Sequence, residues 1–270
     1  MNSANYNKEE IDFLWLNLKD LPYFRAMLRA VEARFYQQVE LASPTLDLGC
    51  GDGHFASLSF NRQLEIGLDP WWGPLQEANQ RKFYRALIQG DAGKMPFPNH
   101  YFSSVVSNSV LEHIPHLDEV IIETGRVLRP GACFYFCVPN HLFNSSLSVG
   151  RALDRMGLRT LSARYRRFYD RIARHQHLDS PDVWQARLER GGFELIRWWH
   201  YFSPQALAVL EWGHLFGLPS LLVRKLTGRW HLIKDAWNFA LTRRIVQQYY
   251  DEPVPQPAGV CTFYIARKME

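Results

Sequence analysis

The chain has 270 residues, of which 47% are apolar and 21% are charged, and its formal net charge is +4. At about 150 residues per domain, this length suggests one sizeable domain with attached elements. The apolar content excludes global disorder, and the charge is far below the basic excess of a dedicated nucleic-acid-binding protein. We therefore expect a globular protein without a nucleic-acid partner.

The four cysteines, at positions 50, 133, 137 and 261, lack both paired C-x-x-C spacing and the density of a secreted disulfide scaffold. The N-terminal residues contain no basic segment followed by an apolar run, so no signal peptide is expected. The stretch Trp198–Val223 is poor in charge, but Glu211 and two prolines interrupt it, so it lacks the roughly 20 continuous apolar residues of a membrane-spanning helix. These features predict a cytoplasmic protein.

Helical spacing of apolar residues, broken at Pro22, predicts two N-terminal helices within residues 1–43. From Pro44 onward, short apolar runs alternate with helical stretches, which is the order of a parallel sheet with crossover helices. We predict an α/β fold with a doubly wound, mostly parallel, seven-stranded Rossmann-like sheet. The expected strands are Thr45–Leu48, Leu64–Leu68, Arg85–Gln89, Ser104–Ser107, Ala132–Val138, Phe193–Tyr201 and Cys261–Ala266. The expected helices between them are Phe55–Asn61, Leu75–Phe83, Leu117–Leu128 and Pro181–Arg190.

Two stretches fall outside this alternation and are predicted to be helical insertions over the strand ends. Residues 44–140 would form the ligand-binding core, followed by a basic insertion at 141–180, a core helix and strand at 181–202, an aromatic insertion at 203–258 and the last strand at 259–270. Between Arg151 and Arg174 the chain has eight arginines and two aspartates, a local charge of 8 − 2 = +6. Since the whole chain carries +4, the remainder carries 4 − 6 = −2.

The most informative segment is Asp47-Leu48-Gly49-Cys50-Gly51-Asp52-Gly53, a strand end followed by a glycine-rich turn that opens a helix. Glycines let the backbone turn sharply beside a ligand, and the helix start offers free N–H groups. This predicts a nucleotide-type ligand at the carboxyl ends of the strands. A dinucleotide fold favours G-x-G-x-x-G, but His54 occupies the third glycine position, which argues against an NAD-dependent dehydrogenase.

Two further strands end in acids. Asp69 lies 20 residues after Gly49, where a carboxylate can accept both ribose hydroxyls, and Asp91 could accept the adenine amino group. The simpler interpretation makes Asp47 a cap of the turn and the other two ordinary loop acids. Their common placement at strand ends favours ligand binding.

At these residues the chain resembles the class I S-adenosylmethionine-dependent methyltransferases, in the broad subgroup that includes small-molecule and ubiquinone-pathway enzymes. The resemblance covers roughly residues 44–140 and rests on DLGCGDG, GLD, GDA, VLEHI and RVLRPG in order. It implies S-adenosylmethionine as cofactor. By resemblance, Asp47, Gly49 and Gly51 surround the methionine part, Asp69 binds the ribose, Asp91 and Ala92 flank the adenine, and Asn108 lies near the methionine end. Cys50 and Pro70, which adjoin these residues, complete the predicted cofactor-binding set.

The implied reaction is an in-line displacement at the sulfonium methyl, for which alignment of the reactants can suffice without a base. We expect a small-molecule acceptor, apolar or lipid-linked, with oxygen as the methylated atom. If the acceptor is a hydroxyl group, His113 and His141 are the catalytic base candidates, ahead of His175 and His177. For His113, packing near the sheet edge is the simpler interpretation. The His175-Gln176-His177 pair lacks a third ligand, and no metal is expected.

Alternative functions are a methyltransferase for a sugar or glycan precursor and a non-catalytic, cofactor-binding partner subunit. The arginine segment can be a solvated helical face, a contact for acidic lipid or phosphate, or a nucleic-acid patch, of which the solvated face is the default. The segments 151–174 and 198–229 together have the composition of a peripheral contact with the inner face of a membrane.

Overall fold

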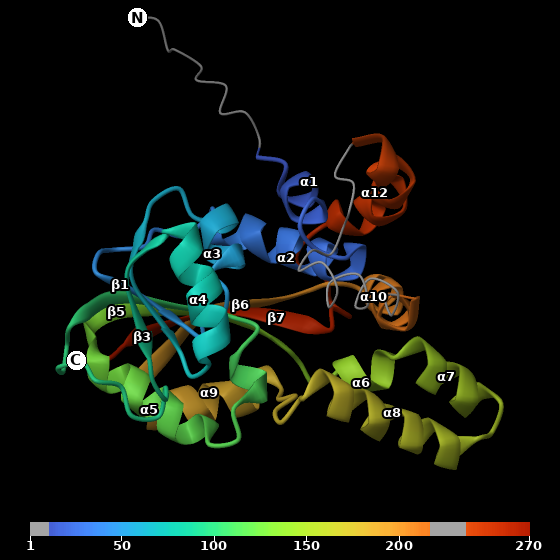
Figure 1. The fold of residues 1–270 in the computed structure, drawn as a ribbon. Coiled ribbons are helices and arrows are strands. Elements are labelled where there is room, and N and C mark those ends of the chain that lie inside the picture. The colour runs from blue at the N-terminus through green and yellow to red at the C-terminus, as the bar shows by residue number, and fades with distance from the viewer. Residues whose placement is uncertain (1–10, 217–235) are drawn as a thin grey trace, which may run out of the picture.

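The computed structural model describes residues 11–216 and 236–270, and Figure 1 shows their arrangement. Seven strands form one sheet in the order β3-β2-β1-β4-β5-β7-β6. Their bounds are β1 Thr45–Leu48, β2 Leu64–Asp69, β3 Tyr84–Gln89, β4 Phe102–Asn108, β5 Leu128–Pro139, β6 Phe193–Tyr201 and β7 Cys261–Lys268. Only β7 runs antiparallel to its neighbours β5 and β6. The predicted doubly wound, mostly parallel α/β fold is confirmed.

Helices cover both faces of the sheet (Figure 1). On one face lie α2 (Tyr23–Tyr36), α3 (His54–Ser59) and α4 (Trp72–Arg81), whose core includes Met27, Phe35 and Ala56. On the other lie α5 (Leu117–Val127) and α9 (Pro181–Arg190), which bury Val120, Trp184 and their neighbours. Burial of these apolar side chains on both faces stabilises the sheet.

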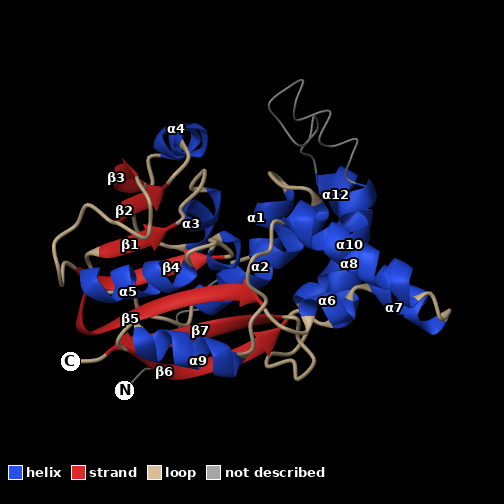
Figure 2. Ribbon diagram, turned by 90° about the horizontal axis from the view of Figure 1, so that it is seen from below, coloured by secondary structure: helices blue, strands red, loops and turns tan. Residues whose placement is uncertain are grey.

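The remaining helices gather at one end of the sheet (Figure 2). Helix α1 (Phe13–Leu18) precedes α2, and the short 3₁₀ helix η1 (Leu111–His113) follows β4. Helices α6 (Phe143–Ser146), α7 (Ser148–Arg155) and α8 (Arg159–Ala173) follow the carboxyl end of β5, while α10 (Pro204–Phe216) and α12 (Ala236–Tyr250) lie between β6 and β7. Helices therefore occupy the described parts of both predicted insertions.

The predicted elements are all present, and the differences lie at their ends. The bounds of β1, β6 and α9 agree with the sequence, but β4 and β5 begin earlier than predicted. Phe102 of β4 pairs with Leu128 of β5 across a register shift, so the partner strand decides where each one begins. Pro181 starts α9 at the first helical position, where its missing N–H removes no hydrogen bond.

Candidate active site

The turn between β1 and α3 is shaped by glycines. Gly49, Gly51 and Gly53 all have positive φ, which costs glycine little. A Cβ on Gly49 would overlap the Val110 side chain, whereas one on Gly51 would meet open space. The N–H groups of Gly49 and Cys50 donate to the Leu68 carbonyl at 2.8 and 3.0 Å, which ties the turn to β2.

The Asp69 carboxylate is held by backbone donors. Its Oδ2 accepts the N–H of Gly51 at 2.9 Å and its Oδ1 accepts the N–H of Trp71, also at 2.9 Å. Burial raises the pKa of Asp69, and these two hydrogen bonds oppose that shift. Each carboxylate oxygen keeps a second lone pair, so Asp69 can still accept hydroxyl groups of a ligand.

Asp47 of β1 is 6% exposed, and the Tyr84 hydroxyl donates to its Oδ2 at 2.6 Å. Burial raises the pKa of Asp47 to about 7, against the opposing effect of the Tyr84 hydrogen bond. A buried carboxyl that titrates near neutrality is stabilised in its charged form by a cation. Asp47 is therefore suited to a positively charged ligand group.

The third strand-end acid is different, because Asp91 is exposed. Its Oδ1 accepts the Gly93 N–H at 2.8 Å and lies 3.2 Å from His116 Nε2. The Gly93 hydrogen bond, followed by that of His116, lowers the pKa of Asp91. Ala92 beside it packs against the buried cluster under α5.

Asn108 joins a buried polar network that the sequence did not indicate. Its Nδ2 donates to Glu32 Oε2 at 2.7 Å, and Cys137 Sγ donates to its Oδ1 at 2.8 Å. Glu32, fully buried in α2, also accepts the hydroxyls of Ser109 and Tyr201 at 2.9 and 3.0 Å. One signal in the sequence could have located Glu32: it is a single acid among the apolar residues Ala30, Val31, Ala33 and Phe35.

Arg29 completes this network. It donates to Glu32 Oε2 at 3.2 Å and to the Asn108 carbonyl at 3.1 Å. Burial disfavours the charged guanidinium, but the charge of Glu32 and other nearby groups outweighs burial and raises the pKa of Arg29. Arg29 and Arg25 of the same helix both line the cleft that also contains Asp47 and Asp69. A guanidinium that stays charged and is paired with Glu32 thus lies at the α2 end of the site.

His113 and Glu112 are neighbours in η1. Glu112 is buried, and burial raises its pKa to about 8. Its Oε1 lies 3.7 Å from His113 Nε2, while His113 Nδ1 lies 3.1 Å from the Arg174 carbonyl. Burial lowers the pKa of His113, which keeps its imidazole neutral near pH 7. The structure thus gives His113 packing partners and also a place at the cleft wall.

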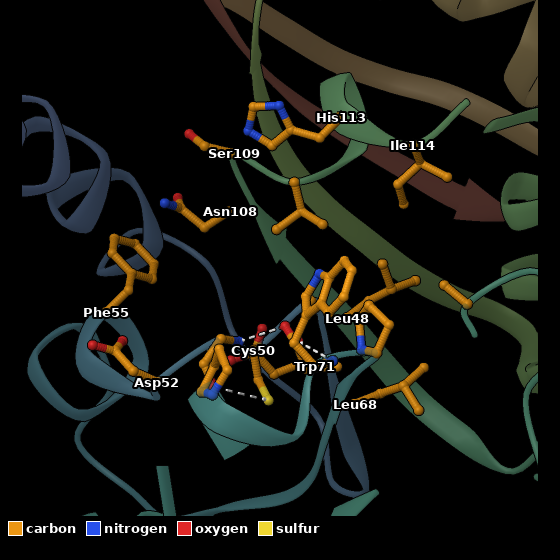
Figure 3. A pocket seen from close by; sticks show the side chains of 18 of the residues that line it. Leu48, Cys50, Asp52, Phe55, Leu68, Trp71, Asn108, Ser109, His113 and Ile114 are labelled. Atoms are coloured by element: carbon orange, nitrogen blue, oxygen red, sulfur yellow. Dashed lines mark hydrogen bonds between the residues drawn. The ribbon is translucent and has the colours of Figure 1, made fainter. Parts of the chain in front are cut away.

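A cleft of about 700 Å³ brings these groups together. Figure 3 shows Asn108, Ser109 and His113 along one wall and Cys50, Leu68 and Trp71 along the facing one. Every predicted cofactor-binding residue lines it, namely Asp47, Gly49, Cys50, Gly51, Asp69, Pro70, Asp91, Ala92 and Asn108. The cleft also takes in residues that the sequence did not single out: Leu21, Arg25, Arg29, Phe55, Trp71 and Val110.

His141, the other base candidate, does not line this cleft. Its ring lies 6.2 Å from that of His200 in β6. His175 stacks on His113 at 6.0 Å, and burial lowers its pKa to about 4. Among the residues the structure describes, no group of three or more His, Cys, Asp or Glu is arranged to hold a metal ion.

The comparisons with known proteins agree with this geometry. Residues 46–136, which contain most of β1, all of β2 to β4 and most of β5, match the family model described as a methyltransferase domain. Residues 46–136 are a methyltransferase domain of the class I, S-adenosylmethionine-dependent type. The predicted family and its cofactor are thereby confirmed, and the glycine turn and the three strand-end acids lie within this methyltransferase domain.

Curated relatives of this chain match it in the region of this domain, over part of their own length. A trans-aconitate 2-methyltransferase from Methylobacterium nodulans is 34% identical over 113 residues, which are 39% of this chain and 42% of that protein. A fatty-acid O-methyltransferase from Mycolicibacterium smegmatis is 33% identical over 96 residues, or 34% of this chain and 35% of that protein. The matched region therefore spans less than half of either relative.

The fold extends the likeness beyond the domain itself. A solved S-adenosylmethionine-dependent methyltransferase from Thermotoga maritima superposes with a TM-score of 0.55 at 12% identity, covering 92% of this chain and 91% of that one. At this identity the similarity concerns the fold alone, since one fold supports many reactions.

Proposed function

We propose that the protein transfers a methyl group from S-adenosylmethionine to a small-molecule acceptor bound in the cleft. One observation carries the proposal: nine predicted cofactor residues, drawn from four strand ends, line a single cleft of about 700 Å³. Ligands of open α/β sheets bind outside the carboxyl ends of the strands, where these residues lie.

The residues present fit the cofactor. The open space at Gly51 admits a close approach to the backbone, and Asp47 offers a carboxylate to the α-ammonium of the methionine part. Asp69 and Pro70 would hold the ribose, and Asp91 and Ala92 would flank the adenine. Asn108, held by Glu32 and Cys137, would lie near the methionine part. Trp71 is 68% exposed at the cleft, and packing against the nucleoside would remove its indole from water.

We propose a carboxylate oxygen as the acceptor atom. Apolar side chains of Leu21, Phe55 and Val110 line the cleft near the basic groups of Arg25 and Arg29. This combination suits an apolar molecule with an anionic end, and the fatty-acid O-methyltransferase relative is consistent with it. When bound, S-adenosylmethionine supplies an electrophilic methyl group on a sulfonium leaving group.

The chain would act mainly by alignment. Arg25 and Arg29 hold and orient the carboxylate, whose lone pair needs no deprotonation, so no catalytic base is required. If the acceptor is instead a hydroxyl group, neutral His113 at the cleft wall is the base candidate. His141 is left out of this proposal because it lies away from the cleft.

We propose a cytoplasmic location, with peripheral contact at the inner face of a membrane where a lipid-linked acceptor would be available. No helix in the described ranges 11–216 and 236–270 is long and apolar enough to cross a bilayer. Of the two predicted contact segments, 151–174 is described in full, whereas residues 217–229 of the second lie outside the described residues.

Methyl transfer from labelled cofactor to long-chain fatty acids tests the proposal. An ester product releases labelled methanol in alkali, whereas an ether or N-methyl product keeps its label, so alkali-labile label is expected. Alkali-stable label would overturn only the proposal that the acceptor atom is a carboxylate oxygen, and methyl transfer itself would stand. Absence of calorimetric affinity for S-adenosylmethionine and its demethylated product would overturn the whole proposal.

The variant Arg25→Gln separates acceptor from cofactor binding. It should raise KM for the fatty acid while leaving cofactor affinity unchanged. A fatty alcohol of the same chain length is the matched substrate control, because it lacks the anionic end.

A further inference from the structure

Helices α7 and α8 form a hairpin whose outer surface combines arginines with exposed apolar side chains. In Figures 1 and 2 this hairpin projects from the rest of the protein. Seven of its eight arginines are exposed: 151, 155, 159, 164, 167, 171 and 174. Five large apolar residues are exposed beside them, namely Met156, Leu158, Leu161, Phe168 and Ile172, of which Met156 at the hairpin turn is 71% exposed. These seven arginines and five apolar residues together are called the arginine face.

The arginine face is not the side of the hairpin that packs against the rest of the protein. The inner side of the hairpin buries Gly150, Ser162 and Tyr169, and the Ser162 hydroxyl donates to the Gly150 carbonyl at 2.9 Å. Fully buried Glu211 of α10 accepts the N–H groups at the start of α7, from Ser148 at 2.6 Å and Val149 at 3.2 Å. The hairpin is thus fixed from within, and its outer side chains remain available to a partner.

The positive charge of the arginine face is not neutralised locally. Asp154 pairs with Arg166 at 2.7 Å, which leaves Asp170, whose Oδ2 accepts Asn144 Nδ2 at 2.7 Å, as one acid against seven exposed arginines. Of the eight arginines, Arg166 alone forms an ion pair with another described residue. Of these eight, the exposed seven can therefore offer their charge to an anionic surface.

We infer that the arginine face docks onto the anionic surface of a lipid bilayer. Guanidinium groups pair with lipid phosphates, while aliphatic side chains such as Met156, Leu158 and Leu161 enter the boundary between headgroups and acyl chains. A single-stranded nucleic acid would favour aromatic stacking platforms, and Phe168 is the only exposed aromatic residue of the face. The mixed composition favours the bilayer.

Docking here would bring the cleft to the membrane. The chain beyond α8 is tied to the cleft wall, because the Glu112 carbonyl accepts the N–H groups of Gln176 at 2.7 Å and His177 at 3.2 Å. The Arg174 carbonyl also contacts His113, which lines the cleft. A membrane-bound hairpin would therefore hold the cleft close to lipid-borne molecules, whatever chemistry the cleft performs.

Sedimentation of the full chain with vesicles tests the inference. The vesicles contain either pure phosphatidylcholine or a mixture with phosphatidylglycerol, at low and high salt. We expect binding to acidic vesicles that falls as salt rises. The triple variant Arg155→Gln, Arg159→Gln and Arg164→Gln should bind roughly a hundredfold more weakly, because each basic residue near an acidic surface contributes about a factor of five. The control Lys82→Gln, Arg85→Gln and Arg190→Gln removes the same charge elsewhere and should bind like the wild type.

A second variant, Met156→Ser with Leu161→Ser, separates insertion from charge, and we expect it to weaken the binding that persists at high salt. Equal binding by the hairpin and control variants, no binding to acidic vesicles at low salt, or binding to an RNA oligomer but not to vesicles would overturn the inference. Cofactor affinity, measured calorimetrically, should be unchanged in every variant. If the wild type binds acidic vesicles but not S-adenosylmethionine, the proposed function fails while this inference stands.

Discussion

The cleft and the helices that follow β5 are held in place by different kinds of contact. At the cleft, backbone conformation and backbone N–H groups position the acids, as at Gly49, Gly51 and Asp69. In the helical region, buried side chains such as Glu211 hold helices that are distant in sequence. The comparison shows that backbone groups of the strand-end turns can build part of a ligand site. The helical surface beside it, like Asp47 and Asn108 within it, depends on side-chain contacts between residues distant in sequence.

The largest expected effect is a loss of stability on substitution in the glycine turn. It tests whether backbone conformation shapes this side of the cleft. Gly49→Ala should lower the free energy of unfolding by about 2–5 kcal/mol, since alanine would sit at positive φ and overlap Val110. Denaturant unfolding measures this loss. Gly73→Ala is the matched control, because its Cβ meets open space and its φ is not positive. Equal unfolding midpoints for the two variants would contradict the prediction.

The buried carboxylate of α10 tests the other region. Glu211→Ala should lower the free energy of unfolding by about 2–4 kcal/mol, because it leaves the N–H groups of Ser148 and Val149 and the Tyr165 hydroxyl without an acceptor. Glu211→Gln keeps one acceptor and should lose less. Limited proteolysis should then cut sooner at the arginines of α7 and α8. A loss of cofactor affinity in these variants would show that the two regions are coupled more tightly than the comparison states.

Substitution of Asp69 tests whether an acid held by backbone N–H groups contributes to ligand binding at the cleft. Asp69→Ala should weaken S-adenosylmethionine binding by about 1–3 kcal/mol, the range for a hydrogen bond to a charged group. Calorimetric titration measures the change, with Asp182→Ala on α9 as the control for loss of one exposed acid. Unchanged affinity would remove Asp69 from the ribose role.

The smallest expected effect is a pH dependence. Because burial raises the pKa of Asp47 to about 7, its carboxyl is mostly protonated at pH 5.5 and half ionised at pH 7. The ionised form attracts the α-ammonium, so cofactor affinity should rise about tenfold over this interval, and binding should release a proton. The interval lies below the usual α-amino pKa of about 8, so the ligand charge stays constant. Asp47→Asn should flatten the profile, and a flat wild-type profile would contradict the assignment.

Sequence patterns were sufficient where a local rule decides the structure. The period of apolar residues predicted the sheet and the helices on its two faces, and the bounds of β1, β6 and α9 agree. The strand-end acids could be placed together because carboxyl ends of parallel strands share one edge of a sheet. For the same reason His113, close after β4, lies at the cleft.

Other features depend on contacts between distant residues, and only the tertiary structure decided them. Glu32 meets Asn108 across 76 positions, and no local pattern pairs them. The strand before His141 was predicted to end at Val138 and ends at Pro139, yet the His141 ring faces His200, because β7 and β6 extend the sheet on that side. The sequence by itself determined the fold class, the glycine turn and the acids of the cleft, since these follow from backbone geometry and period. Tertiary packing decided which charges are buried as partners and which, on α7 and α8, are left exposed.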